Sequence, residues 1–146
     1  MVRSEGILVG DVFRSDSVTM TEEYGARLAR ELTSGTVFAL FGGMGMGKSA
    51  LVRGIASGLG LSAEVSSPTF ALVHDYSGNP PLVHFDMYRV TGWEDLYSTG
   101  YFDYLDAGAI LVVEWSENIV SALPEDAIRL TFTRVDENTR LIEREC

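Results

Sequence analysis

Apolar side chains recur at helical spacing in two segments of the first half of the chain. Within residues 21–33 they follow one another at intervals of four, which predicts an amphipathic helix that Gly35 terminates. The same interval within residues 48–59 predicts a second helix, with Gly60 as its cap. The apolar positions that carry the two patterns are Tyr24, Leu28 and Leu32 in the first helix and Leu51, Ile55 and Leu59 in the second.

Shorter apolar runs predict β-strands. Residues 36–41 and 109–113 are apolar at nearly every position, as expected of strands that are covered on both faces of a sheet. A capping box at Thr91–Glu94 predicts the start of a short helix. The remaining predicted strands are 7–13, 70–76, 82–88, 128–134 and 140–145, with turns at 77–81 and 136–138. Helices and strands that alternate and then give way to hairpins predict a three-layer α/β fold with a mixed sheet.

Length and composition favour one globular domain that spans residues 1–146. A chain of 146 residues is able to bury a core without disulfide bonds, and 46% of its residues are hydrophobic. The single cysteine, Cys146, argues against a disulfide framework or a cysteine-based metal site and suits a reducing cytosol. Because no signal peptide is visible and no apolar run approaches the roughly 18 residues of a membrane span, we expect a cytoplasmic protein without membrane contact.

The charge of the chain limits the partners that it binds directly. Lys and Arg number 11 against 21 Asp and Glu, which gives a net charge of −10. A domain that holds nucleic acid by itself carries a basic surface, whereas this chain would repel a phosphate backbone over most of its surface. We therefore expect any work on RNA or DNA to require another protein that holds the nucleic acid.

The strongest chemical signal is the glycine-rich segment Gly42–Ser49, which matches the phosphate-binding pattern G-x-x-x-x-G-K-[ST]. Eight of the 15 glycines lie between residues 35 and 60, which indicates a need for backbone freedom in this region. Backbone N–H groups and the start of the following helix form an anion site, to which Lys48 adds a positive charge. The Ser49 hydroxyl is a candidate Mg²⁺ ligand, and the segment predicts binding of a nucleoside triphosphate. The predicted nucleotide-binding residues are Gly42, Gly45, Met46, Gly47, Lys48, Ser49 and Ala50.

Two carboxylates are candidates for the second Mg²⁺ anchor that such a loop requires. Glu114 follows the apolar run 110–113, so we expect it to emerge at the nucleotide end of the sheet. Asp86 lies in a predicted strand, on the face opposite the large apolar residues, and a structural role fits it as well as a functional one. His74 and His84 are interpreted as packed side chains, because no cluster of metal ligands surrounds them.

Two further segments have a functional and a structural interpretation. Pro68 restrains the residue before it, so the loop Ser66–Phe70 presents hydroxyls that are able to sense a γ-phosphate through Mg²⁺. A Ser/Thr-rich turn that leads into a strand explains the same residues. The aromatic residues between 93 and 115 are interpreted first as core and rim, and second as a surface for a partner.

Taken in order, these segments resemble the TsaE family, small ATPases required for threonylcarbamoyladenosine (t6A) modification of tRNA. The shared motifs are the phosphate-binding loop, V-x-S-P-T-F at 65–70, H-x-D-x-Y-R at 84–89 and an apolar strand that ends in Glu114-Trp115. The resemblance covers roughly residues 17–142. It implies a P-loop NTPase-like three-layer fold with a mixed, largely parallel central sheet and antiparallel additions.

The same resemblance implies roles for individual residues. Ser49 and Glu114 match the Mg²⁺ ligand positions, and Thr69 and Asp86 match the switch and catalytic positions. ATP is the implied nucleotide, and no N-K-x-D motif for reading guanine is present. The segment 15–19 and the basic residue Arg140 are carried over as contacts of the nucleotide.

The implied partners are proteins of the TsaB and TsaD types, the second of which carries the transferase chemistry. The tRNA would then be contacted only through the complex, in agreement with the acidic charge. Two other functions stay open. A small-molecule kinase shares the loop but needs an arginine-rich lid, which the scattered arginines of this chain do not suggest. A nucleotide-dependent assembly module is the second alternative.

Overall fold

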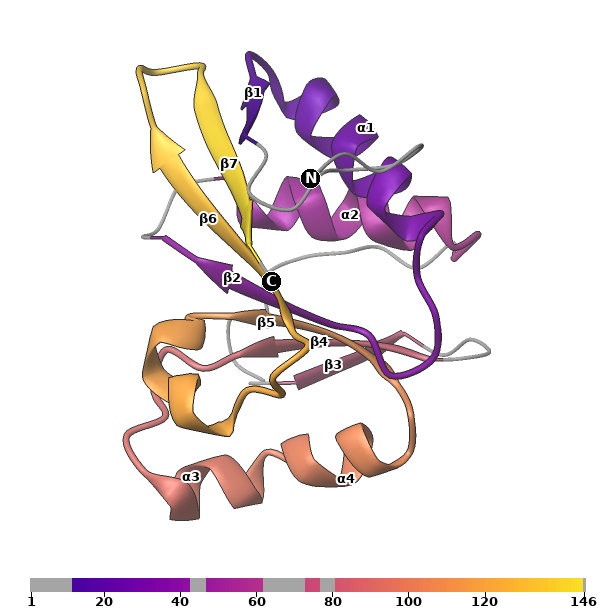
Figure 1. Ribbon diagram of the computed structural model, residues 1–146, viewed down its shortest axis with the longest axis vertical. Helices are drawn as coiled ribbons and strands as arrows, with labels where there is room; N and C mark the ends of the chain where they lie inside the picture. Colours follow the sequence, from indigo (N-terminus) through magenta and orange to yellow (C-terminus); the bar gives the residue numbers. More distant parts are fainter. Residues whose placement is uncertain (1–11, 43–46, 62–72, 77–80, 146) are drawn as a thin grey trace.

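The protein is described by a computed structural model that covers residues 12–42, 47–61, 73–76 and 81–145. Seven strands form one sheet in the order β1-β7-β6-β2-β5-β4-β3 (Figure 1). The four central strands β6, β2, β5 and β4 are parallel, whereas β1, β7 and β3 join as antiparallel additions. The predicted mixed sheet with a largely parallel centre is therefore confirmed.

The order of elements follows the predicted order over the described residues. The strands are β1 (Val12–Ser15), β2 (Val37–Phe41), β3 (Val73–Tyr76), β4 (Leu82–Asp86), β5 (Ile110–Glu114), β6 (Ile128–Arg134) and β7 (Arg140–Glu145). The helices are α1 (Val18–Ala29), α2 (Lys48–Gly58), α3 (Trp93–Ser98), α4 (Tyr101–Asp106) and the 3₁₀ helix η1 (Ser116–Ala122). Within the described residues, no helix combines the length and apolarity needed to cross a membrane.

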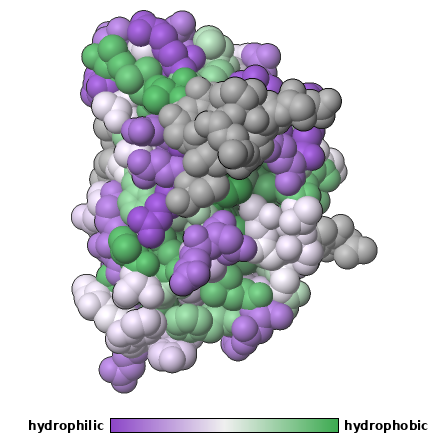
Figure 2. Space-filling view, in the orientation of Figure 1, coloured by the Kyte–Doolittle hydropathy of each residue, from purple (hydrophilic) through white to green (hydrophobic). Residues whose placement is uncertain are grey.

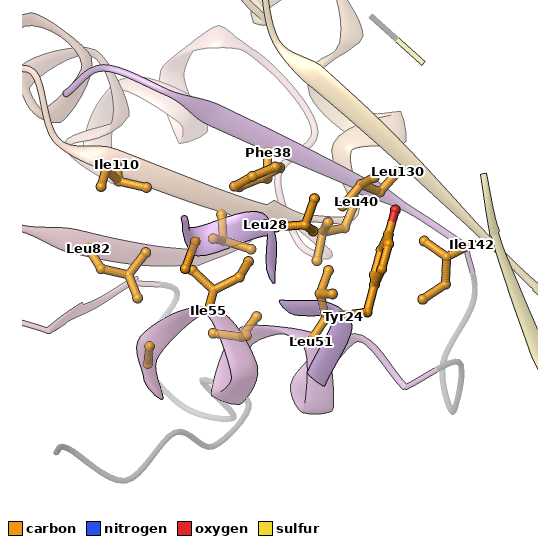
Figure 3. Packing of buried hydrophobic residues seen from close by; sticks show 14 of the residues in the cluster. Tyr24, Leu28, Phe38, Leu40, Leu51, Ile55, Leu82, Ile110, Leu130 and Ile142 are labelled. Carbon is orange, nitrogen blue, oxygen red and sulfur yellow. The ribbon is translucent and has the colours of Figure 1, made fainter. Parts of the chain in front are cut away.

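Helices cover both faces of the sheet, so the molecule has three layers (Figure 1). On one face, α1 and α2 pack over a cluster that includes Val112 and, as Figure 3 shows, Leu40. On the other face, α3, α4 and η1 surround a second cluster that includes Phe85 and Leu111. Successive strand residues point to opposite faces, so the central strands supply both clusters. This explains why these strands are apolar at nearly every position.

Helices α1 and α2 approach each other at three glycines. A Cβ atom on Gly54 would lie 2.0 Å from the carbonyl oxygen of Glu22, and one on Gly25 would lie 2.4 Å from that of Leu51. A Cβ on Gly58 would meet a methyl group of α1 at 2.6 Å. The prediction of backbone freedom is therefore wrong for Gly54 and Gly58, because both lie inside α2 and allow close helix contact.

The predicted bounds of the first helix are wrong at both ends. The Ser17 side chain accepts a hydrogen bond from the Met20 N–H and caps α1, which therefore starts at Val18. The helix ends at Ala29, so Gly35 does not terminate it. Apolar spacing extended the prediction because Leu32, beyond the end of the helix, still packs against the core.

Other element ends also differ from the predictions. The predicted strand 7–13 overlaps β1 only at its last two residues, and the rest of it lies outside the described residues. Strand β4 ends at Asp86, whose Oδ1 accepts a hydrogen bond from the Tyr88 N–H in the following turn. The capping box is wrong in its partner, because the N–H and hydroxyl of Thr91 both donate to Asp95 rather than to Glu94.

Candidate nucleotide-binding site

The carboxyl ends of the parallel strands meet along one edge of the sheet, and the predicted site residues gather there. Strand β2 ends at Phe41, directly before the glycine-rich loop. Strands β4 and β5 end at Asp86 and Glu114, and these two residues are partners in the strand register. In open α/β sheets, ligands bind beyond the carboxyl ends of strands. The structure therefore brings the predicted carboxylates to the edge from which the loop leaves.

The start of α2 has the backbone conformation that its sequence predicts. Gly47 is the N-cap residue with φ 89° and ψ 16°, a left-handed conformation that glycine adopts without steric cost. A Cβ atom there would meet nothing within 4 Å, so the requirement for glycine is conformational. Lys48, Ser49 and Ala50 form the first turn of α2, with Ser49 partly exposed. Gly45 and Met46 lie outside the described residues.

Lys48 lies at the centre of the described part of the site. Its side chain is only 4% exposed, and its Nζ donates a hydrogen bond of 2.8 Å to the Gly42 carbonyl oxygen. The same Nζ lies 3.9 Å from Oε1 of Glu114 and 4.9 Å from the centroid of the Trp115 ring. A buried ammonium group requires such compensation, and these contacts hold the positive charge beside the phosphate-binding loop.

Glu114 is held from two sides. Its side chain is 8% exposed, with Oε1 toward Lys48 and Oε2 accepting a hydrogen bond from Nε2 of the fully buried His84. His84 is buried, as its interpretation as a packed side chain requires, but its hydrogen bond to Glu114 was not predicted. His84 lies two residues before Asp86, so both side chains point to the same face of the strand. This spacing was the sequence signal that could have placed His84 near the predicted carboxylates.

The start of η1, shortly after β5, connects the glycine-rich loop to the end of strand β4. The Gly42 N–H donates a hydrogen bond of 3.0 Å to Oε2 of Glu117, and Nδ2 of Asn118 donates one of 2.8 Å to the Met87 carbonyl oxygen. Trp115, between β5 and η1, has a left-handed backbone with φ 58°, which is unfavourable for a side chain of its size. Neither Glu117 nor Asn118 belongs to a recognised motif, so neither was predicted to take part in the site.

Asp86 and Thr69 are the residues predicted at the catalytic and switch positions. Asp86 is partly exposed at the edge of the site, where its Oδ1 accepts the Tyr88 N–H at 2.9 Å. Its predicted catalytic role stays a prediction. Thr69 and the loop Ser66–Phe70 lie outside the described residues.

The residues predicted at the base end of the nucleotide lie at the same end of the sheet. Ser15 pairs with Arg140 in the β1–β7 register, and β7 lies two strands from β2, a separation of roughly 10 Å. Nη1 of Arg140 donates to the carbonyl oxygens of Asp136 and Glu137 at 2.8 and 3.3 Å. The Ser15 hydroxyl bonds to Thr21 at 2.6 Å, next to the start of α1. A role of these residues in nucleotide binding stays a prediction.

The oxygen donors at this edge suit Mg²⁺. Glu114 offers a carboxylate and Ser49 a hydroxyl, the hard oxygen ligands that this cation prefers. Among the described residues, no group of three His, Cys, Asp or Glu side chains is arranged to hold a metal ion. A Mg²⁺ ion at a phosphate-binding loop takes few protein ligands, since substrate phosphates and water supply the others. The donor set therefore fits an ion that binds together with a nucleotide.

Comparisons with known proteins bear on the family and the fold of the chain. The family profile for "Threonylcarbamoyl adenosine biosynthesis protein TsaE" matches residues 15–143. A tRNA threonylcarbamoyladenosine biosynthesis protein TsaE from Streptomyces coelicolor is 42% identical over 80% of this chain and 81% of its own length. The protein of that name from Treponema pallidum is 34% identical over 88% of this chain and 95% of its own length. The crystal structure of YdiB from Bacillus subtilis superimposes with a TM-score of 0.77 at 27% identity, and covers 92% of this chain and 83% of that one.

Proposed function

The chain belongs to the TsaE family, and from that premise we propose that it is a Mg²⁺-dependent ATPase that supports t6A modification of tRNA. We propose further that it works in the cytoplasm, as one domain within a complex that contains TsaB- and TsaD-type proteins. The observation that carries the proposal is the buried Lys48, whose Nζ lies between the Gly42 carbonyl and Glu114. An ammonium group beside such a loop is the feature that binds the β- and γ-phosphates.

Each site residue has a definite task in this proposal. Lys48 binds the phosphate oxygens, and Ser49 and Glu114 hold Mg²⁺, which when bound neutralises negative charge on the β- and γ-phosphates. Asp86 positions the attacking water or accepts its proton, since it is the register partner of Glu114 at the same edge. Thr69 is assigned the sensing of the γ-phosphate from its position in the V-x-S-P-T-F motif.

The assignment of the loop is tested by nucleotide affinity. Lys48→Ala should weaken ATP binding far more than adenosine binding, because the ammonium group meets the phosphates and not the base. Arg53→Ala is the matched control, since Arg53 is a cation of the same helix that pairs with Glu22 at 2.8 Å. Isothermal titration calorimetry measures both affinities. Unchanged ATP affinity in Lys48→Ala would contradict the assignment.

The two carboxylates are separated by their dependence on Mg²⁺. Glu114→Gln removes a charged ligand and should raise the Mg²⁺ concentration needed for half-maximal hydrolysis. Asp86→Asn should lower the turnover rate with a smaller effect on nucleotide affinity. Wild-type Mg²⁺ dependence in both variants would show that neither residue is a metal ligand.

The indirect route to tRNA follows from charge. At a net charge of −10, the isolated protein should not bind tRNA measurably near physiological salt, because such binding requires cationic contacts that release counterions. A filter-binding assay at about 150 mM salt, where the Debye length is about 8 Å, measures this. Tight tRNA binding by the isolated chain would contradict the indirect route.

Reconstitution with a TsaB–TsaD pair tests the assignment to the complex. We expect ATP-dependent association and t6A formation, and we expect Thr69→Ala to retain ATP binding while it loses ATP-dependent association. Hydrolysis rates of the isolated and the partner-bound protein separate an ATPase from an assembly module that only binds nucleotide. No t6A formation on adding the chain to the pair would overturn the proposal.

A further inference from the structure

We propose that His84 is a positioning residue that holds the Glu114 carboxylate in the orientation required for Mg²⁺ and nucleotide binding. The inference rests on the proposed role of Glu114 as a Mg²⁺ ligand. It concerns a residue that the sequence analysis treated as packing alone.

The geometry comes from two adjacent parallel strands. His84 lies on β4 and pairs with Val112 of β5, two residues before Glu114, so both side chains point to the face that α1 and α2 cover. The His84 Nε2–H donates to Oε2 of Glu114, while Oε1 of the same carboxylate faces Lys48. Each carboxylate oxygen therefore has its own partner, and rotation of the group would break at least one contact.

The burial of His84 argues against a role in packing alone. The residue is fully buried, and burial of a polar ring is unfavourable unless its polar atoms are hydrogen-bonded. In the part of the chain that the structure describes, Nδ1 of His84 has no hydrogen-bond partner. The bond from Nε2 to Glu114 is therefore the hydrogen bond that the ring makes among these residues. An apolar side chain would fill the same volume without the unfavourable free energy of burying a polar ring atom.

The neighbouring strand provides a comparison. His74 of β3 is the register partner of His84 and is partly exposed. Its ring stacks on Tyr76 with centroids 4.0 Å apart. Among the described residues, His74 has this ring contact and no hydrogen bond to a carboxylate, although it shares a sheet face with His84. The contact with Glu114 is therefore specific to the strand on which His84 lies.

The physical reason for such a residue lies in the demands of the cation. A ligating carboxylate must present one oxygen in a fixed direction, and ligating side chains are themselves held by hydrogen bonds to residues behind them. Loss of such a partner typically weakens metal affinity by about 10- to 100-fold. By holding Oε2, His84 leaves Oε1 on the side of the loop and Lys48.

Two substitutions distinguish a hydrogen-bond donor from a space-filling side chain. His84→Leu retains an apolar volume but has no donor. His84→Gln carries an amide N–H₂ that reaches the position of Nε2. His74→Gln is the matched control on the partner strand, and Glu114→Gln is the reference for loss of the ligand. Melting temperatures of all variants establish that each is folded.

The readout is direct binding of a fluorescent ATP analogue, with and without Mg²⁺. The dissociation constant without Mg²⁺, divided by the constant with Mg²⁺, measures how much Mg²⁺ strengthens nucleotide binding. We expect His84→Leu to lower this ratio about tenfold or more, His84→Gln to retain most of it, and His74→Gln to leave it unchanged. Electron paramagnetic resonance measures the affinity for Mn²⁺ in the presence of unlabelled ATP, independently of hydrolysis. This affinity should fall most in His84→Leu, less in His84→Gln and not at all in His74→Gln.

The outcomes separate this inference from the proposed function. A lower ratio in Glu114→Gln together with a wild-type ratio in His84→Leu would overturn the inference and leave the ATPase proposal standing. Wild-type ratios in both variants would overturn the role of Glu114 as well. If His84→Gln behaved like His84→Leu, donation from the Nε2 position would not be the property that matters, and the inference would fail.

Discussion

The two helical layers that cover the sheet are held by different means. Helices α1 and α2 have 12 and 11 residues and meet backbone to backbone at glycines. Helices α3 and α4 have six residues each and rely on side-chain contacts, such as the edge contact between Tyr101 and Phe85, whose ring centroids are 5.8 Å apart. In Figure 2, hydrophobic, intermediate and hydrophilic areas are intermixed over the lower part of the molecule, where Figure 1 shows α3 and α4.

The two layers also differ in how close they lie to the candidate nucleotide-binding site. Helix α2 begins at Lys48, so a displacement of α2 relative to the sheet would move the ammonium group relative to Glu114. Among the described residues, the opposite layer reaches the site through the start of η1, where Glu117 accepts a hydrogen bond from Gly42. Two of its aromatic side chains, Trp93 and Tyr97, are 54% and 66% exposed. We infer that the first layer tolerates little change, and that the second has surface available for a partner.

The largest loss of unfolding free energy is expected for a substitution at the contact between α1 and α2. Gly54→Ala puts a methyl group 2.0 Å from the Glu22 carbonyl oxygen, so the helices must separate, with an expected loss of about 3 kcal/mol or more in unfolding free energy. Gly92→Ala is the control in the other layer, since a Cβ there meets nothing within 4 Å, and should lose less than about 1 kcal/mol. Urea unfolding measures both. Equal losses would abolish the distinction between the layers.

A smaller effect is expected at the buried tyrosine of the second layer. Tyr101 donates its hydroxyl to the Ala122 carbonyl oxygen at 3.0 Å, so Tyr101→Phe should lose about 1 kcal/mol at neutral pH. Burial raises the pKa of Tyr101 from 10.0 to about 12. Its stabilisation is therefore complete below pH 10.0 and lost as the pH rises toward about 12, because ionisation favours the unfolded chain.

Urea unfolding at neutral pH and above pH 10 checks this prediction. The wild-type protein should lose stability more steeply with alkaline pH than Tyr101→Phe does. Tyr97→Phe is the control, since its ring is exposed. Parallel pH profiles for wild type and Tyr101→Phe would contradict the assignment.

The exposed aromatic residues should matter more for association than for folding. Trp93→Ala and Tyr97→Ala each remove a ring contact with Phe102 and should lose less than about 1 kcal/mol of unfolding free energy, yet weaken ATP-dependent association with a TsaB–TsaD pair. Val18→Ala, an exposed apolar residue of α1, is the matched control. Thermal unfolding and a pull-down measure the two properties. Equal association of all three variants would argue against a partner surface on α3.

The smallest effect is expected at the start of α3. Hydrogen bonds from the Thr91 hydroxyl and N–H lower the pKa of the exposed Asp95 below its ordinary value of 3.8. The stabilisation from this pair is present above pH 3.8 and lost as the pH falls through the lowered pKa. Thr91→Val removes the hydroxyl and should raise the pKa of Asp95 part of the way back.

Carboxyl titration by nuclear magnetic resonance checks this change. Asp136 is the internal control, because the N–H groups of Asn138 and Thr139 lower its pKa independently of Thr91. An unchanged pKa of Asp95 in Thr91→Val would assign the lowering to the backbone N–H alone.

Local patterns were sufficient for much of the fold and part of the site. The bounds of β6 and β7 match the predicted strands residue for residue, because period and composition reflect the conformation of the segment itself. The glycine-rich motif likewise predicted a need for backbone freedom, and Gly47 at the start of α2 has the left-handed conformation that requires it. The errors at the ends of α1 arose where a cap or a packed turn competes with the apolar period.

The sequence by itself determined the elements, the phosphate-binding motif and the carboxylates at the ends of strands. The tertiary structure alone decided which side chains those groups meet. His84 and Glu114 are 30 residues apart, and Gly42 and Glu117 are 75 apart. Their hydrogen bonds exist because β5 lies between β2 and β4 in the sheet. Strand order results from the burial of whole layers, so no local spacing within the chain specifies those contacts.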